Sequence, residues 1–141
     1  MIYYLIASIL IAVAALFART KRAVLAAGIL FYAVQIAAAG LLLWGGLYDT
    51  TSAAFFTFDA LGTLFYLLLV VVSMYVFGHS EAYLQGEDLR SYRLYFALLM
   101  LLTTAIAGAY FANNLAVTWI FLEATTLCSA GIIYHLSLIH I

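Results

Sequence analysis

The stretch FFTFDALGTLFYLLLVVVSMYVF, residues 55–77, decides the fold of this chain. It contains one charged residue, Asp59, and no proline. Its length exceeds the ~20 residues that an α-helix needs to cross the hydrocarbon core of a bilayer. The stretch therefore predicts a transmembrane helix.

Four further apolar runs flank this stretch when the chain is divided where its charges cluster. They cover residues 2–18, 23–47, 94–111 and 115–135. No basic region precedes the first run, and its charges follow it, so we interpret it as a permanent span and not as a cleaved signal peptide. The sequence predicts an all-α polytopic membrane protein with five transmembrane helices in a lipid bilayer.

The composition excludes several other classes of protein. Of 141 residues, 69% are hydrophobic and 8% are charged, whereas roughly a quarter of the residues in soluble domains are charged. Five Lys and Arg against six Asp and Glu supply no basic surface for nucleic acid. The single cysteine and three well-separated histidines, Cys128, His79, His135 and His140, predict no disulfide framework and no metal site. No nucleotide, haem or iron–sulfur motif is present, so we expect no cofactor and no redox catalysis in this chain.

The basic residues predict the topology. All five fall in the first and third connections between the apolar runs: Arg19, Lys21, Arg22, Arg90 and Arg93. In a five-helix zigzag these two connections lie at the same end. The positive-inside rule then places that end in the cytoplasm and the N-terminus outside.

Aromatic and small residues suggest how the helices are placed and packed. Interfacial belts are one interpretation, and random scatter the other, for Tyr3, Tyr4, Trp44, Tyr48, Tyr83, Tyr92 and Tyr95. In the fourth run Thr104, Gly108 and Ala112 recur every four residues, so another helix is expected to approach this stripe closely. Gln35, inside the second run, is interpreted as an interhelical hydrogen-bonding residue.

Two acidic residues remain inside the apolar runs. Asp59 lies in the first turns of the third predicted helix, and Glu123 lies eight residues into the fifth. At a rise of about 1.5 Å per residue, Glu123 is about 12 Å down its helix, near the bilayer midplane. A carboxylate there costs a few kcal/mol, so it has to be neutral, paired or hydrated. Because desolvation raises the pKa of a carboxyl group and a nearby cation lowers it, a group so placed can take up and release a proton.

Glu123 is therefore the first candidate for proton transfer. Its predicted helical face carries small and hydroxyl-bearing groups and is expected to point toward the protein interior; it comprises Ala116, Trp119, Thr126 and Ala130. The alternative is a glutamate that only hydrogen-bonds a neighbouring helix. Asp59 is a secondary candidate, because near the outer end of its helix it can also reach water or cap the helix start.

Three blocks of the sequence resemble the antiporter-like membrane subunits of respiratory complex I, Mrp cation/proton antiporters and group 4 membrane-bound hydrogenases. They are FDALGTLF (58–65), RLYFALLMLL (93–102) and ANNLAVTWIFLEATTLCSA (112–130). Within that superfamily, LEATTLCSA followed by IIYH is most similar to the F subunit of the hydrogenase-4 or formate hydrogenlyase type. The resemblance covers about residues 55–135, and the first two helices match only in hydrophobic character.

The resemblance implies about fourteen transmembrane helices, with two inverted five-helix repeats around a hydrated axis at mid-membrane. It implies that Glu123 corresponds to the key glutamate of the proton path and Asp59 to a secondary motif position. Asn113-Asn114 stands where relatives often have Asp-Asn, which removes a charge. The implied setting is the prokaryotic cytoplasmic membrane, with other membrane subunits of a respiratory or hydrogenase complex as partners.

The same resemblance predicts that the chain is an N-terminal fragment, because the family's buried lysines lie on later helices. Residues 136–141, LSLIHI, resemble the in-frame translation of a transposon end used to prepare sequencing libraries, and they begin where the family resemblance stops. We therefore expect them to be non-native.

The sequence thus predicts a proton-translocating subunit of a redox-driven complex, with the redox chemistry in other subunits. One alternative is a sodium/proton antiporter subunit of the Mrp type. Another is a structural or assembly membrane protein in which Glu123 does not titrate.

Overall fold

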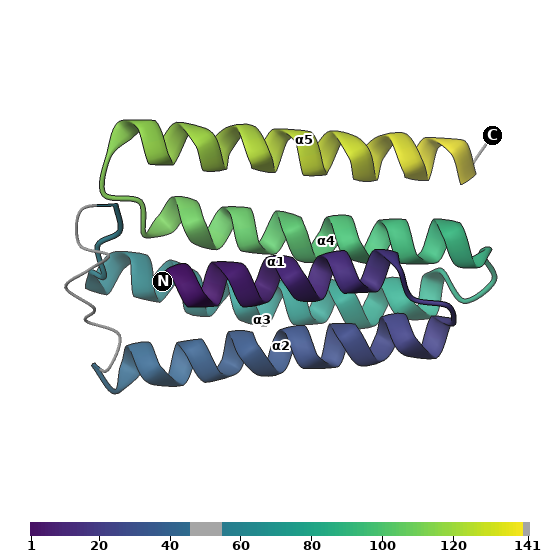
Figure 1. Ribbon diagram of the computed structural model, residues 1–141, viewed down its shortest axis with the longest axis horizontal. Helices are drawn as coiled ribbons and strands as arrows, with labels where there is room; N and C mark the ends of the chain where they lie inside the picture. Colours follow the sequence, from purple (N-terminus) through teal and green to yellow (C-terminus); the bar gives the residue numbers. More distant parts are fainter. Residues whose placement is uncertain (46–54, 140–141) are drawn as a thin grey trace.

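The computed structural model describes residues 1–45 and 55–139 (Figure 1). These residues form five helices: α1 (Ile2–Leu16), α2 (Lys21–Leu43), α3 (Ala60–Tyr83), α4 (Leu89–Tyr110) and α5 (Leu115–Ile139). The all-α prediction is confirmed for this part of the chain. Tyr48, His140 and the last two residues of the 23–47 run lie outside the described residues.

Four of the helices, α2 to α5, are long and apolar enough to cross a membrane. The helix α1 has 15 residues and is about 22 Å long at 1.5 Å per residue, against a hydrocarbon core of about 30 Å. The chain thus has the helices of an integral membrane protein. The first predicted span is shorter than expected, since its helix stops at Leu16.

Side chains that cap helices set several of the boundaries. Thr20 starts α2 by accepting a hydrogen bond from the backbone N–H of Ala23 at 3.2 Å. Asp88 starts α4 by accepting from the N–H groups of Arg90 and Ser91 at 3.2 and 3.4 Å. Because a cap satisfies N–H groups that the first helical turn leaves unpaired, α4 begins at residue 89 and not at residue 94 as predicted.

The third predicted run is wrong at both ends. Residues 55–59 precede the helix, and residues 55–57 pair with the α4–α5 connection. The N–H of Thr57 donates to Phe111 O at 2.8 Å, and the N–H of Asn113 donates to Phe55 O at 2.7 Å. A single antiparallel bridge joins Phe56 to Ala112. At the other end α3 continues six residues past Phe77 to Tyr83.

The helix α4 lies at the centre of the bundle. It packs against each of the other four helices, whereas α5 packs only against α4 among the described elements (Figure 1). Small buried residues let the neighbours approach, as predicted for Gly108, where a Cβ atom would lie 2.3 Å from the ring of Phe121 on α5. Thr104 is also buried, and its hydroxyl donates to Met100 O at 2.9 Å within the helix.

Gly108→Ala is expected to destabilise the α4–α5 contact by about 1–3 kcal/mol, the usual cost of overpacking. The added methyl group has to displace the ring of Phe121. Gly78→Ala is the matched control, because Gly78 also lies inside a helix and nothing is within 4 Å of its Cβ position. Unfolding in mixed detergent micelles should show a loss for the first variant and a gain of up to about 1 kcal/mol for the second. Equal behaviour of the two would contradict the packing described.

The two connections that carry the basic residues lie at the same end of the bundle (Figure 1). The Lys21 ammonium on α2 donates to Gln85 O in the α3–α4 connection at 2.7 Å and lies 5.4 Å from the ring centre of Tyr92. The predicted zigzag is therefore confirmed for the described residues. We call this end, with Arg19, Lys21, Arg22, Arg90 and Arg93, the basic end.

Candidate functional site

Glu123 lies on the face of α5 that points away from α4. Its side chain is exposed, and it forms no hydrogen bond or ion pair with any residue that the structure describes. The surrounding face is apolar and exposed as well, with Trp119 63%, Leu122 51% and Leu127 71% exposed. The expectation that this face points to the protein interior is therefore wrong within the described chain. The stripe that packs toward α4 is the opposite one, with Phe121 over Gly108 and Gly131 beside Leu98.

Hydroxyl groups follow Glu123 along α5, but they are bonded to the backbone. The hydroxyls of Thr125 and Thr126 donate to Leu122 O at 2.7 and 3.0 Å, and that of Ser129 donates to Thr125 O at 2.8 Å. Each hydroxyl oxygen retains lone pairs and can still accept a hydrogen bond. None supplies a donor to Glu123, so in a bilayer this carboxyl group needs a proton, water or a cation from outside the described residues.

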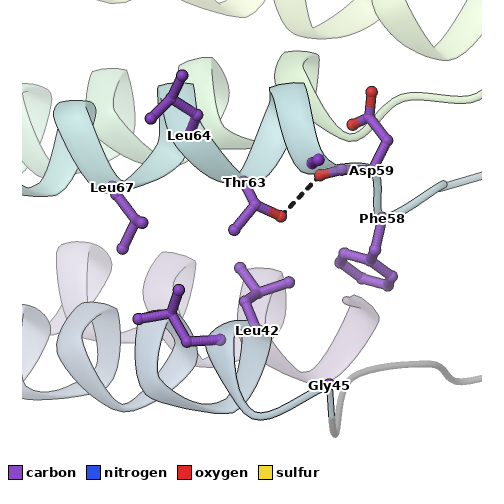
Figure 2. Close-up of a pocket in the computed structure, with 9 residues that line it drawn as sticks. Leu42, Gly45, Phe58, Asp59, Thr63, Leu64 and Leu67 are labelled. Carbon is purple, nitrogen blue, oxygen red and sulfur yellow. Dashed lines mark hydrogen bonds between the residues drawn. The ribbon is translucent and has the colours of Figure 1, made fainter.

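Asp59 caps α3. Its Oδ1 atom accepts a hydrogen bond from the N–H of Gly62 at 3.0 Å, and the hydroxyl of Thr63 donates to Asp59 O at 2.7 Å (Figure 2). The residue therefore precedes the helix, and the placement in its first turns was wrong. The alternative that Asp59 caps a helix start is confirmed, while its secondary role in proton transfer stays a prediction.

A cavity of about 360 Å³ lies beside Asp59, between the end of α2 and the start of α3. Figure 2 shows the carboxylate of Asp59 pointing away from Leu42 and Gly45, while the Thr63 side chain lies between the two helices. The cavity walls are largely leucine and phenylalanine side chains. The carboxylate of Asp59 therefore does not point into this cavity. Among the described residues, no hydrogen bond joins Asp59 to Glu123.

Asp59→Ala is expected to destabilise the chain by about 1 kcal/mol, because Ala cannot accept from the N–H of the first helical turn. Asp59→Asn keeps that acceptor and should stay within a few tenths of a kcal/mol of the original chain. Unfolding in mixed micelles distinguishes the two. An equal loss in both variants would mean that the charge, and not the cap, is what matters at this position.

A buried polar cluster joins three helices around Gln35, whose side chain is 0% exposed. The Tyr4 hydroxyl of α1 and the Tyr66 hydroxyl of α3 donate to Gln35 Oε1 at 2.6 and 2.9 Å. Gln35 Nε2 donates to Ser8 Oγ at 3.4 Å. The interpretation of Gln35 as an interhelical hydrogen-bonding residue is confirmed.

Several tyrosines were misplaced by the belt interpretation. Tyr4 belongs to the Gln35 cluster, while Tyr92 and Tyr95 are 2% and 8% exposed and pack in the core. Tyr66 was not identified from the sequence as a member of the Gln35 cluster. A tyrosine in the middle of an apolar run does indicate an interhelical hydrogen bond, because its buried hydroxyl requires a partner. Exposed Trp44, at 90%, fits an interfacial position.

Asn114 has a structural role that the sequence did not reveal. Its Oδ1 atom accepts a hydrogen bond from the N–H of Val117 at 2.9 Å at the start of α5. An asparagine is a good helix cap. The second residue of the Asn113-Asn114 pair thus helps to place the helix that carries Glu123.

The described residues contain no cluster of three or more histidine, cysteine, aspartate or glutamate side chains that could hold a metal ion. Comparison with models of protein families, with curated proteins and with solved structures found no match for the chain. Glu123, on its exposed apolar face, is the feature of the described chain that most needs a functional explanation.

Proposed function

We propose that this chain is the N-terminal part of a proton-translocating membrane subunit of a redox-driven complex, of the group 4 hydrogenase or complex I type. The observation that carries the proposal is the position of Glu123. It lies on an exposed apolar face of α5, a candidate membrane span, without a partner among the described residues. Intramembrane carboxyl groups are rare because they are costly, and those that persist usually mark ion or proton pathways.

An ionised carboxylate on such a face costs several kcal/mol when lipid surrounds it, so it needs contact with another helix or with water. The family resemblance supplies a partner, since relatives place a buried lysine on a later helix. A positive charge on that lysine would lower the proton affinity of the glutamate, and its neutralisation would raise it. Glu123 would then accept a proton in one state and release it in the other.

Small residues beside Glu123 on α5 support the proposal that a partner helix packs at this site. Ala116, Thr126 and Ala130 are small exposed residues on the same side as Glu123. Small side chains allow close helix approach in membranes, where packing and not the hydrophobic effect drives association. Other membrane subunits of the complex and later helices of the same subunit are the proposed partners, and the redox reaction takes place in separate subunits.

The orientation follows from the basic end. Because basic residues are enriched on the cytoplasmic side of membrane proteins, we place the basic end in the cytoplasm and the N-terminus outside, in a prokaryotic cytoplasmic membrane.

Proton uptake into vesicles that contain the full-length subunit with its complex tests this function. A trapped pH-sensitive dye should report proton movement that is driven by the redox reaction and needs no sodium gradient. Strict dependence on sodium would favour an Mrp-type antiporter subunit instead. An assembled complex that moves no protons would contradict the proposal and favour the structural alternative.

A further inference from the structure

A second site lies at the basic end, far along α5 from Glu123. A cleft of about 830 Å³ opens between the start of α4 and the end of α5. Its volume falls in the range of about 300–1,000 Å³ that is usual for sites of small molecules. The basic end of the bundle is the level at which lipid headgroups lie in a membrane.

The upper part of the cleft carries charges of both signs. Glu87, Asp88 and Arg90 line it together with Ser91. The Ser91 hydroxyl and the backbone N–H groups of Ser91 and Arg90 hold the pKa of Asp88 below its usual value, so this carboxylate stays ionised while it caps α4. Glu87 and Arg90 form no ion pair with any described residue, so both charges are available to a ligand.

The lower part of the cleft is apolar and narrow. Leu94 and Leu98 follow Arg90 along one side of α4, and Gly131 faces them from α5. A Cβ atom on Gly131 would lie 3.1 Å from the nearest methyl group of Leu98. The glycine therefore lets α5 pack directly against Leu98, and this contact forms the apolar floor of the cleft.

His135 lies between the two parts. The helices are antiparallel, and Gly131 packs beside Leu98, so His135 is level with residue 94, about 6 Å deeper than Arg90 at 1.5 Å per residue. His135 lines the cleft and is 7% exposed, and its Nε2 atom is buried without a hydrogen-bond partner. Because this atom is fully buried, the imidazole contributes its ring to the wall of the cleft and no hydrogen bond to an occupant.

We propose that this cleft binds a phospholipid with a primary-ammonium headgroup, that is, a phosphatidylethanolamine. The phosphate accepts hydrogen bonds from the Arg90 guanidinium, and the ammonium donates to the Glu87 carboxylate. An acyl chain lies along Leu94 and Leu98 over Gly131. The glycerol part of the lipid, which lies below its phosphate, packs beside the His135 ring.

The charge pattern distinguishes this lipid from the other common phospholipids. The quaternary ammonium of phosphatidylcholine has no N–H group to donate to Glu87. Phosphatidylglycerol has no cation at all, so Glu87 and Asp88 repel it. The proposal does not depend on proton transfer by Glu123.

Native mass spectrometry of the chain in detergent, with the three lipids added at equal concentration and with identical acyl chains, tests the proposal. Phosphatidylethanolamine is expected to be retained at least about 10-fold better than the other two, as one charge-assisted hydrogen bond would give. Equal retention of all three lipids, or a preference for phosphatidylglycerol, would overturn the proposal.

Two charge variants and two matched controls locate the site. Glu87→Gln should lower retention of phosphatidylethanolamine to that of phosphatidylcholine, and Arg90→Gln should weaken retention of all three lipids. Glu81→Gln and Arg93→Gln change charges at the same end that do not line the cleft, and should behave like the original chain. If the two pairs of variants behave alike, the lipid does not bind here.

Gly131→Leu is expected to displace Leu98 from the floor of the cleft and abolish the lipid preference, whereas Gly78→Leu, at a glycine with nothing within 4 Å of its Cβ position, should keep it. If Gly131→Leu fails to fold, the Glu87→Gln and Arg90→Gln variants alone test whether the lipid binds in the cleft. Added phosphatidylethanolamine should also shift the ¹⁵N resonance of the His135 imidazole and leave that of exposed His79 unchanged. Equal shifts at both histidines would contradict binding in the cleft.

Discussion

Glu123→Gln in the full-length subunit is expected to reduce proton movement by at least about 100-fold, the usual contribution of a positioned acid–base group, while the complex still assembles. Glutamine keeps the shape and hydrogen-bonding capacity of the side chain but cannot take up and release a proton at neutral pH. Because Glu123 is exposed and forms no hydrogen bond or ion pair with any described residue, the substitution removes no such interaction within that part of the chain. Dye-reported proton uptake and the yield of purified complex are the two measurements.

Glu81→Gln is the matched control, since it makes the same acid-to-amide change at the basic end, away from both candidate proton-transfer residues. The Gln85 Nε2 atom donates to Glu81 Oε1 at 3.2 Å, and a glutamine oxygen still accepts that bond, so proton uptake is expected to stay near that of the original subunit. Unchanged uptake in Glu123→Gln would refute a proton relay through this residue. Failure of that variant to assemble would indicate that Glu123 serves as an interhelical contact.

Gln35→Leu is expected to destabilise the chain by about 2–3 kcal/mol. The substitution leaves the hydroxyl of Tyr4 and that of Ser8 without their glutamine partner, and a buried unsatisfied polar group costs about 1–3 kcal/mol. Hydrogen bonds in membranes contribute about 0.6–2 kcal/mol each, and Tyr66 keeps a longer bond of 3.2 Å to Gln35 O. Unfolding by detergent titration, followed by circular dichroism, measures the loss.

Two tyrosine variants on α3 supply the control for this cluster. Tyr66 is 1% exposed and bonded to Gln35, whereas Tyr75 is 76% exposed. Tyr66→Phe should be destabilising and should couple to Gln35→Leu in a double-mutant cycle. Tyr75→Phe should do neither. Additive effects of Tyr66→Phe and Gln35→Leu would contradict the hydrogen bond between these residues.

The number and order of the helices were predictable because apolar length is a strong signal. The ends of the helices were not predictable, because they depend on individual capping side chains and the length of an apolar run carries no information about these. Asp88 extends α4 backward over Arg90 and Arg93, and the backbone pairing of residues 55–57 with the α4–α5 connection delays α3. Asp59 and Asn114 likewise set the starts of α3 and α5 by capping them, which apolar runs do not reveal.

The covered face of each helix was much harder to predict. A helix that is apolar all round has no clear polar side, so its sequence does not say which stripe meets the protein. For α5 the stripe that includes Phe121 meets α4, and Glu123 faces outward. Tyr66 and Tyr4 show the same difficulty. Their hydroxyls both donate to Gln35 Oε1, and this arrangement exists only when α1, α2 and α3 pack together.

Infrared difference spectroscopy on the intact complex tests the central claim most directly. During turnover, the carbonyl band of a protonated carboxyl group should appear and disappear, and this change should be missing in the Glu123→Gln variant. A Glu123 band that stays constant through turnover, in either charge form, would contradict proton transfer by this residue.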